Sequence, residues 1–258
     1  MTAKDKVVDV SNEHFHAWTT YWGKLKTVSD PCGDTRIYGF ENVSADNSTK
    51  RIGTTPEAGA TYGYVIEGGV RVLSDNAHWA LYEGQYFSFR GGFQFDLFKK
   101  SRIVVLQKLD FLGINVAGGP IEEKGRLKYI DLCSDTLLVA PPYLGDPCLN
   151  HLHFPIGIDQ TEHTHPSVRA GAVARGAGWC ETPEGRSELE PGVIFTIPRD
   201  GKHRFVTDLS YMDIIAYHPD SDWGPTDEVH PMVNRTWVDG HKIDNTVGIH
   251  TQAEVIGR

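Results

Sequence analysis

The sequence predicts an all-β protein built from two β-barrel (jelly-roll) units in tandem. From residue 51 onward, short runs rich in Val, Ile, Tyr and Phe alternate with Gly, Asp and Asn turns. Such closely spaced short runs are typical of sandwiches and barrels. The chain also repeats itself, because Gly176 and Gly192 lie 108 positions after Gly68 and Gly84 within similar strand and turn patterns. A duplicated β unit therefore accounts for both observations.

The expected elements follow the chain in order. Residues 1–50 form a mixed, polar N-terminal extension, in which HFHAWTTYWGKL fits either a short helix or an edge strand. The first barrel spans 51–139 and carries the strand-like runs YGYVIEGGVRVL, HWALYEGQYFSF, RIVVLQKLDFLG and YIDLCSDTLLVA. The proline-rich stretch APPYLGDPC predicts a linker at 140–149. The second barrel spans 150–217, and a C-terminal tail, 218–258, is expected to pack on the barrels.

Composition narrows the class of protein. The chain has 258 residues, 40% of them hydrophobic and 23% charged, which is ordinary for a soluble globular protein. A net charge of -9 disfavours nucleic acid as a partner. No apolar run approaches the ~20 residues of a membrane helix, and the start MTAKDKVVDVSNEHF lacks a signal-peptide run. The scattered Cys32, Cys133, Cys148 and Cys180 suit free thiols in a reducing cytosol, so a cytoplasmic location is expected.

The later unit carries two spaced motifs. They run Gly157, His163, His165, Arg169 and Gly176, and then Gly192, Pro198 and His203. This order resembles the cupins, whose motifs are Gly-x5-His-x-His-x3-4-Glu-x6-Gly and Gly-x5-Pro-x-Gly-x2-His-x3-Asn. Three positions depart from the family pattern: Arg169 replaces the glutamate, Gly201 comes one residue late, and Thr207 replaces the asparagine. The resemblance covers about 150–217 and implies a bicupin with one metal site, in the second barrel.

The physical argument agrees with this resemblance. Residues two apart in a strand face the same side, so His163 and His165 share one interior, and His203 can join them from a neighbouring strand. Three imidazoles suit Fe, Mn, Ni, Cu or Zn and leave positions open for a substrate. The alternative is a polar edge strand without metal. The first unit has Thr55, Glu57 and Phe95 at the ligand positions, with Thr61 matching Arg169, so we expect it to support the fold or form a homodimer.

Arg169 is the main candidate for a catalytic, substrate-binding residue. A guanidinium cannot ligate a metal, and a cation beside a metal ion is favourable only when an anion joins them. On the same inward face, Gly171 and Val173 are expected to leave room for that anion. Gln160 and Glu162 are expected to hydrogen-bond the ligand imidazoles from behind. The alternative is that Arg169 turns outward or pairs with a local acid such as Glu162.

Three of the histidines outside the motifs lie close to them in the sequence. His151 and His153 form a second pair two residues apart, and are either pocket residues or, more simply, structural. His218-Pro-Asp220 has an HxD pattern but lies after the last expected strand, so no role is assigned to it.

Three-histidine cupins without the glutamate resemble thiol, diketone and gentisate-type dioxygenases, which implies an Fe(II)-dependent oxygenase that uses O2 on a small to medium organic anion. The alternatives are a Zn-, Mn- or Ni-dependent lyase or isomerase, and a cupin that only binds a small molecule. The fold resemblance does not decide among these.

Overall fold

The computed structural model describes residues 9–44, 48–53, 59–74, 77–221, 236–238 and 240–242. Apart from the 3₁₀ turn η1 (Ile130–Leu132), every regular element described is a β-strand, which confirms the all-β prediction. The chain divides into two compact units, Met1–Ser221 and Asp222–Arg258. Within the described part of the second unit, β22 (Trp237–Val238) pairs with β23 (His241–Lys242). No helix in the described part of the chain is long and apolar enough to cross a membrane.

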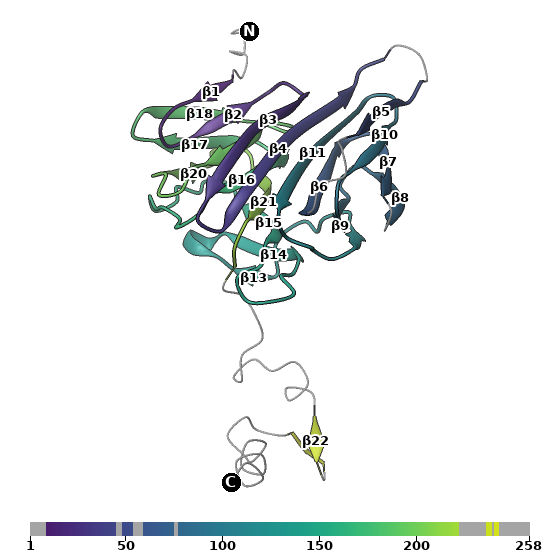
Figure 1. Ribbon diagram of the computed structural model, residues 1–258. Coiled ribbons are helices and arrows are strands. Elements are labelled where there is room, and N and C mark those ends of the chain that lie inside the picture. The colour runs from purple at the N-terminus through teal and green to yellow at the C-terminus, as the bar shows by residue number, and fades with distance from the viewer. Residues whose placement is uncertain are drawn as a thin grey trace. The chain divides into compact units, whose positions relative to one another are not determined.

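The earlier part of the first compact unit contains two facing sheets, here called the N-terminal sheets (Figure 1). The six-stranded sheet has the order β12 (Val116–Gly118), β9 (Tyr86–Arg90), β6 (Gly59–Glu67), β11 (Ser101–Leu109), β4 (Gly33–Asn42) and β3 (Trp22–Asp30). The four-stranded sheet has the order β5 (Lys50–Gly53), β10 (Gln94–Leu97), β7 (Gly69–Ser74) and β8 (Ala77–Tyr82). Aromatic and aliphatic side chains fill the space between these sheets.

The later part has the same construction, and we call its sheets the C-terminal sheets. The eight-stranded sheet has the order β1 (Val10–Ser11), β2 (His16–Trp18), β19 (Ile194–Ile197), β16 (Arg169–Gly176), β21 (Met212–His218), β15 (Cys148–Phe154), β14 (Ser134–Val139) and β13 (Leu127–Lys128). The three-stranded sheet has the order β18 (Gly185–Leu189), β17 (Gly178–Thr182) and β20 (Arg204–Val206). A second apolar core lies between them.

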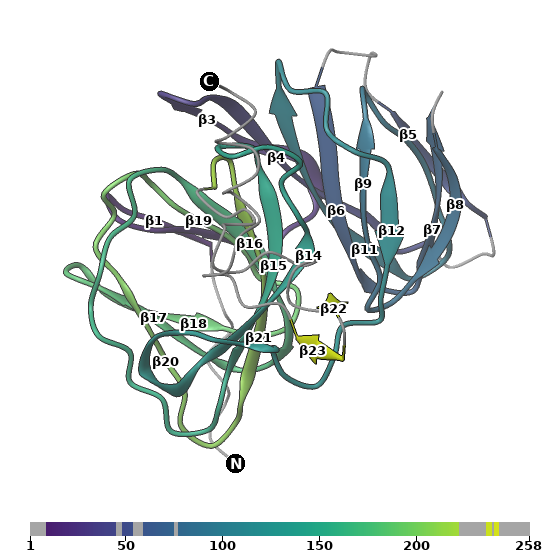
Figure 2. The ribbon, with the colours of Figure 1, turned by 90° about the horizontal axis from the view of Figure 1, so that it is seen from below.

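A third core joins the two halves, which lie side by side in Figure 2. It forms where the outer faces of the six-stranded and eight-stranded sheets meet, and it includes Tyr62 and Leu106 from one sheet and Ile215 and Tyr217 from the other. The rings of Tyr62 and Tyr217 lie 5.4 Å apart between centroids. Strands at this junction are covered on both faces, which explains why β6 and β21 are almost entirely buried.

The two halves repeat one strand order. The order β9-β6-β11-β4-β3 in the N-terminal half corresponds to β19-β16-β21-β15-β14 in the C-terminal half. Gly68 and Gly176 end equivalent strands with φ angles of 71° and 69°. A Cβ at either position would lie 2.5 Å or less from the carbonyl oxygen of the residue that precedes the adjacent strand, so both positions require glycine. The topology therefore agrees with a duplication.

One equivalence expected from the 108-residue offset is wrong. Val72 pairs with Phe95, whereas the equivalent Cys180 pairs with Phe205, so Phe95 corresponds to Phe205. The later half has two more residues between Pro198 and Phe205 than the earlier half has between Arg90 and Phe95. The N-terminal counterpart of His203 is therefore Phe93, which is buried in the aromatic core. Thr55 and Glu57 lie outside the described residues.

Two expected boundaries also need correction. The first 50 residues are not an extension, because β3 and β4 pair within the six-stranded sheet and β2 pairs with β19. The stretch 140–149 is not a linker between units, because it connects β14 to its antiparallel partner β15. The chain instead passes from one half to the other between β12 and β13. Proline marks a loop, but it does not show which two strands the loop connects.

Candidate metal centre

Three histidines meet at one end of the C-terminal half. His163 forms an isolated antiparallel bridge with His203, in which each backbone N–H donates to the other residue's carbonyl at 2.9 and 3.0 Å. His165 follows two residues later, and the three ring centroids lie 4.5, 5.0 and 5.2 Å apart. One nitrogen from each ring lies within 4.8 Å of the other two. The chain thus brings together all three residues that the motif spacing singled out.

Backbone carbonyls orient two of these rings. His163 Nδ1 lies 2.8 Å from the carbonyl of Thr161, and His203 Nδ1 lies 2.9 Å from that of Gly201. Each ring therefore carries its proton on Nδ1 and keeps a lone pair on Nε2. His203 Nε2 is buried and has no partner among the described residues. An orphaned lone pair of this kind fits a metal ion, and so does a donor set of three imidazoles.

Burial keeps two of the rings, those of His165 and His203, neutral. Burial, with smaller contributions from Arg169 and the neighbouring imidazoles, lowers the pKa of His165 from 6.5 to about 3. Burial lowers the pKa of His203 to about 4, although the hydrogen bond to Gly201 opposes this shift. A neutral imidazole is the form that ligates a metal. These two side chains are therefore held in the ligating form at neutral pH.

Arg169 begins β16, lines the same cavity and is largely buried. Its Nη1 donates to the Ser167 hydroxyl at 2.6 Å and to the Val168 carbonyl at 3.1 Å, and lies 3.8 Å from Asp220 Oδ1. Its Nε is buried without a partner among the described residues. Glu162, the alternative partner, instead pairs with Lys202 at 2.6 Å. Arg169 is therefore held at one nitrogen while its Nε has no acceptor.

The cavity behind the histidines is small and mostly apolar. Its volume is about 40 Å³, and side chains of the apolar core form much of its wall. Sequence reasoning missed four polar residues here. Tyr129, Asp135 and His218 line the cavity, and Asp220 lies beside Arg169. The HxD pattern at 218–220 is the available signal. The sequence predicts that the last strand ends before His218, which is in fact the last residue of β21.

Other expected site residues lie elsewhere. Gly171 and Val173 do not line the cavity; a Cβ on Gly171 would lie 1.9 Å from the Ile215 carbonyl oxygen, so this glycine permits strand packing. Val173 is part of the apolar core. Gln160 lines the cavity, but its Oε1 accepts from the Phe205 backbone N–H at 3.2 Å. Neither Gln160 nor Glu162 hydrogen-bonds an imidazole of the described site.

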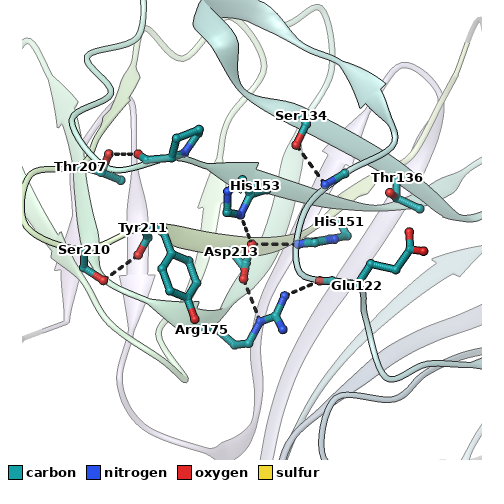
Figure 3. Close-up of polar contacts among 12 residues, drawn as sticks. Glu122, Ser134, Thr136, His151, His153, Arg175, Thr207, Ser210, Tyr211 and Asp213 are labelled. Carbon is teal, nitrogen blue, oxygen red and sulfur yellow. Dashed lines mark hydrogen bonds and ion pairs between the residues drawn. The ribbon is translucent and has the colours of Figure 1, made fainter.

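His151 and His153 form a separate cluster (Figure 3). They lie on the opposite face of β15 from the cavity-lining Leu152 and Phe154. His151 Nε2 and His153 Nδ1 approach Asp213 Oδ1 at 2.9 and 2.8 Å, and Arg175 Nε donates to Asp213 Oδ2 at 2.7 Å. Hydrogen bonds from both imidazoles hold the pKa of Asp213 below its ordinary value, against the opposing effect of its burial. These histidines are thus structural partners of a buried carboxylate.

All four cysteines are free, in agreement with the sequence prediction. Cys133, Cys148 and Cys180 are buried, and burial raises the pKa of each thiol. Protonated, buried thiols are poor nucleophiles and poor ligands.

Comparisons with known proteins fit this architecture. No protein-family model and no curated protein matches the sequence. A cupin 2 conserved barrel domain protein from Leptotrichia buccalis is 12% identical, with a TM-score of 0.55 over 83% of this chain and 97% of that one. A putative glyoxylate-induced protein from Pseudomonas aeruginosa is 14% identical, with a TM-score of 0.57 over 86% and 94%.

A third solved structure, salicylate 1,2-dioxygenase from Pseudaminobacter salicylatoxidans, is 10% identical. Its TM-score is 0.55, over 72% of this chain and 71% of that one. At these identities a structural likeness establishes the fold and leaves the activity open. With its two facing pairs of sheets and these neighbours, the chain has the cupin fold.

Proposed function

We propose that this protein is an Fe(II)-dependent cupin oxygenase, a dioxygenase in the leading form, that acts on a small to medium organic anion. One observation carries the proposal: two buried nitrogens of opposite character lie without partners in the walls of the same cavity. His203 Nε2 offers a lone pair, and Arg169 Nε offers a proton. A metal ion satisfies the first, and an anionic oxygen satisfies the second.

His163, His165 and His203 would hold the metal. When bound, Fe(II) supplies a redox centre with open coordination positions for a substrate and for O2. The residues of the chain prepare that centre, since the carbonyls of Thr161 and Gly201 fix two rings and burial keeps His165 and His203 neutral. The apolar cavity wall excludes water and strengthens electrostatic interactions inside.

Arg169 would bind the anionic end of the substrate. Three neutral ligands leave the charge of a divalent ion uncompensated, and the guanidinium adds a further positive charge beside it. Asp220, 3.8 Å from Nη1, offsets only part of this charge because it is itself partly exposed. A cavity of about 40 Å³ holds a carboxylate-sized group. The acid group of the substrate would therefore lie inside the cavity, and the rest of the substrate would lie toward its opening.

The structural neighbours support the reaction class. One of them is a salicylate 1,2-dioxygenase, a name that describes an oxygenase acting on an organic anion. The proposed assignment shares with it the fold and the type of substrate.

Elemental analysis of protein purified without oxygen tests the metal site. We expect about one iron per chain, and loss of most metal in His203→Ala with a native circular dichroism spectrum. His78→Ala, an exposed histidine on β8, is the matched control and should keep its metal. Unchanged metal content in His203→Ala would refute the assignment of the third ligand.

Oxygen uptake tests the reaction. Iron-loaded protein, screened against aromatic and aliphatic carboxylic acids, should consume O2 with at least one of them. Turnover of an acid without O2 uptake, by protein loaded with zinc, manganese or nickel, would instead indicate a lyase or isomerase.

For the acid that reacts, Arg169→Lys should raise KM more than it lowers kcat. Lysine keeps the positive charge but lacks the planar guanidinium that can donate two parallel hydrogen bonds to a carboxylate. Arg169→Glu should keep the metal and lose activity. An Arg169→Ala variant with unchanged kcat/KM would contradict the binding role.

A further inference from the structure

A groove of about 480 Å³ lies on the other side of the β14–β15 pair from the metal cavity. The connection between the two halves passes over these strands and is fastened to them. The Gly125 N–H donates to the Ser134 hydroxyl at 3.0 Å, and the Arg126 N–H donates to the Thr136 hydroxyl at 3.1 Å. Ser134 appears with its partner in Figure 3. The groove is therefore bounded by a fixed backbone.

The groove is lined by cations although the protein as a whole is acidic. Lys124, Arg126 and Lys128 line it, and none of the described carboxylates does, whereas the full chain has a net charge of -9. Nearby acids are turned to other partners. Glu122 accepts from Arg126 Nε and Nη2 at 2.7 and 2.6 Å, so the charge of this one lining cation is already partly neutralised. Asp131 accepts from the Thr161 N–H at 2.7 Å. The adjoining open hollow is lined by Glu122 and Glu123 together with Lys124, Gly125 and Arg126.

The floor of the groove contains an oriented imidazole. His153 Nδ1 lies 2.8 Å from Asp213 Oδ1, and the Asp213 side chain is fully buried. Arg175 holds the other oxygen of Asp213 at 2.7 Å, so the carboxylate cannot rotate away (Figure 3). With Nδ1 engaged, Nε2 is the ring nitrogen left for a ligand.

We propose that this groove is a second binding site, for a small molecule that carries a carboxylate or phosphate group. Lys124 and Lys128 supply positive charge at the rim, and the oriented His153 ring forms part of the floor. The three come from segments fastened together, so little ordering of the protein is required. The site is separate from the metal cavity, because among the described residues Tyr129 alone lines both. It does not depend on bound metal.

Titration of the metal-free, full-length protein with citrate and, separately, with inorganic phosphate tests the proposal. Backbone amide chemical shifts are followed in low-salt buffer. Saturable shifts at residues 124–134 and at His153 are expected with at least one probe, and the tighter probe identifies the group that the groove prefers. The double variant Lys124→Gln/Lys128→Gln should raise the dissociation constant about tenfold, because each exposed cation contributes a factor of roughly three.

Lys24→Gln is the matched control, since Lys24 is exposed on β3 in the other half; its binding should equal that of the unmodified protein. Two outcomes would overturn the proposal. One is shifts confined to Gln160, His163 and Arg169, which would place the anions in the metal cavity alone. The other is a chemical-shift change that rises linearly with probe concentration, without saturation, and is the same in the double variant.

Discussion

Lowering the pH should destabilise the metal-free protein in a range set by its two buried ligand histidines. In the unfolded chain these imidazoles have the ordinary pKa of 6.5. In the folded chain the pKa is about 3 for His165 and about 4 for His203. Below pH 6.5 the unfolded chain binds protons that the folded chain does not, so the free energy of unfolding falls as the pH falls. The loss continues until the pH reaches the folded-state values.

The magnitude follows from these pKa values. Between pH 8 and pH 5, a pKa lowered from 6.5 to about 4 costs about 2 kcal/mol for His203, whose side chain is fully buried. His165 is partly exposed, so solvent screening reduces its contribution to about 1 kcal/mol. The two together remove about 3 kcal/mol, a large share of the stability of an ordinary domain.

Urea denaturation of protein stripped with a chelator, at pH 8 and pH 5, measures this difference. His203→Gln cannot take up the proton, so its stability should change about 2 kcal/mol less between the two pH values. His78→Gln, an exposed histidine, should show the full dependence of the unmodified protein. Equal pH dependence in His203→Gln and the unmodified protein would refute the argument.

Four further substitutions should change the free energy of unfolding, measured by urea denaturation at neutral pH. Gly171→Ala should cost about 3 kcal/mol or more, because its Cβ would lie 1.9 Å from a backbone oxygen. Gly157→Ala, with φ of 77° and open space around it, should cost only about 1 kcal/mol; equal costs would disprove the packing role of Gly171. Phe93→Ala should cost about 3–5 kcal/mol through its cavity and leave metal content unchanged. Asp213→Ala should cost about 3–5 kcal/mol, since it leaves two imidazoles and a guanidinium without their carboxylate; a neutral effect would show that the cluster is not structural.

The fold was predictable because its signals are periodic and local. Alternating apolar runs and turn glycines recur in both halves, and glycines such as Gly68 and Gly176 are fixed by close approach between strands. The three histidines were predictable for a related reason, since family spacing and side-chain direction place them together. The boundaries were not predictable, because a sequence does not show which strands pair. Strand β4 joins the six-stranded sheet and strand β2 joins the eight-stranded sheet, and the partner strand of each lies more than fifty positions later in the sequence.

The remaining site residues are brought in by long-range pairing. Asp135 reaches the cavity because β14 pairs with β15, and His218 because β21 pairs with β15 and β16. Gly171 was expected to leave room for a substrate because it is small, yet its small size serves an approach between backbones. The absence of a side chain has two explanations, open volume or close packing, and only the position of the neighbouring strand decides between them.

The two halves show how one scaffold yields a core in one copy and a cavity in the other. At the position of His203 the N-terminal half has Phe93, whose ring stacks on Phe95 with centroids 4.9 Å apart and meets the edge of Tyr38 at 5.2 Å. At the position of Arg169 it has Thr61, whose hydroxyl donates to the Gly91 carbonyl at 2.8 Å. Every polar group at these positions is thus satisfied or absent, and the space is filled with aromatic rings.

In the C-terminal half the same positions hold nitrogens that lack partners among the described residues. Natural proteins rarely leave buried polar atoms unpaired, because each costs about 1–3 kcal/mol. The contrast between these equivalent positions therefore supports the proposed ligand site in the C-terminal half.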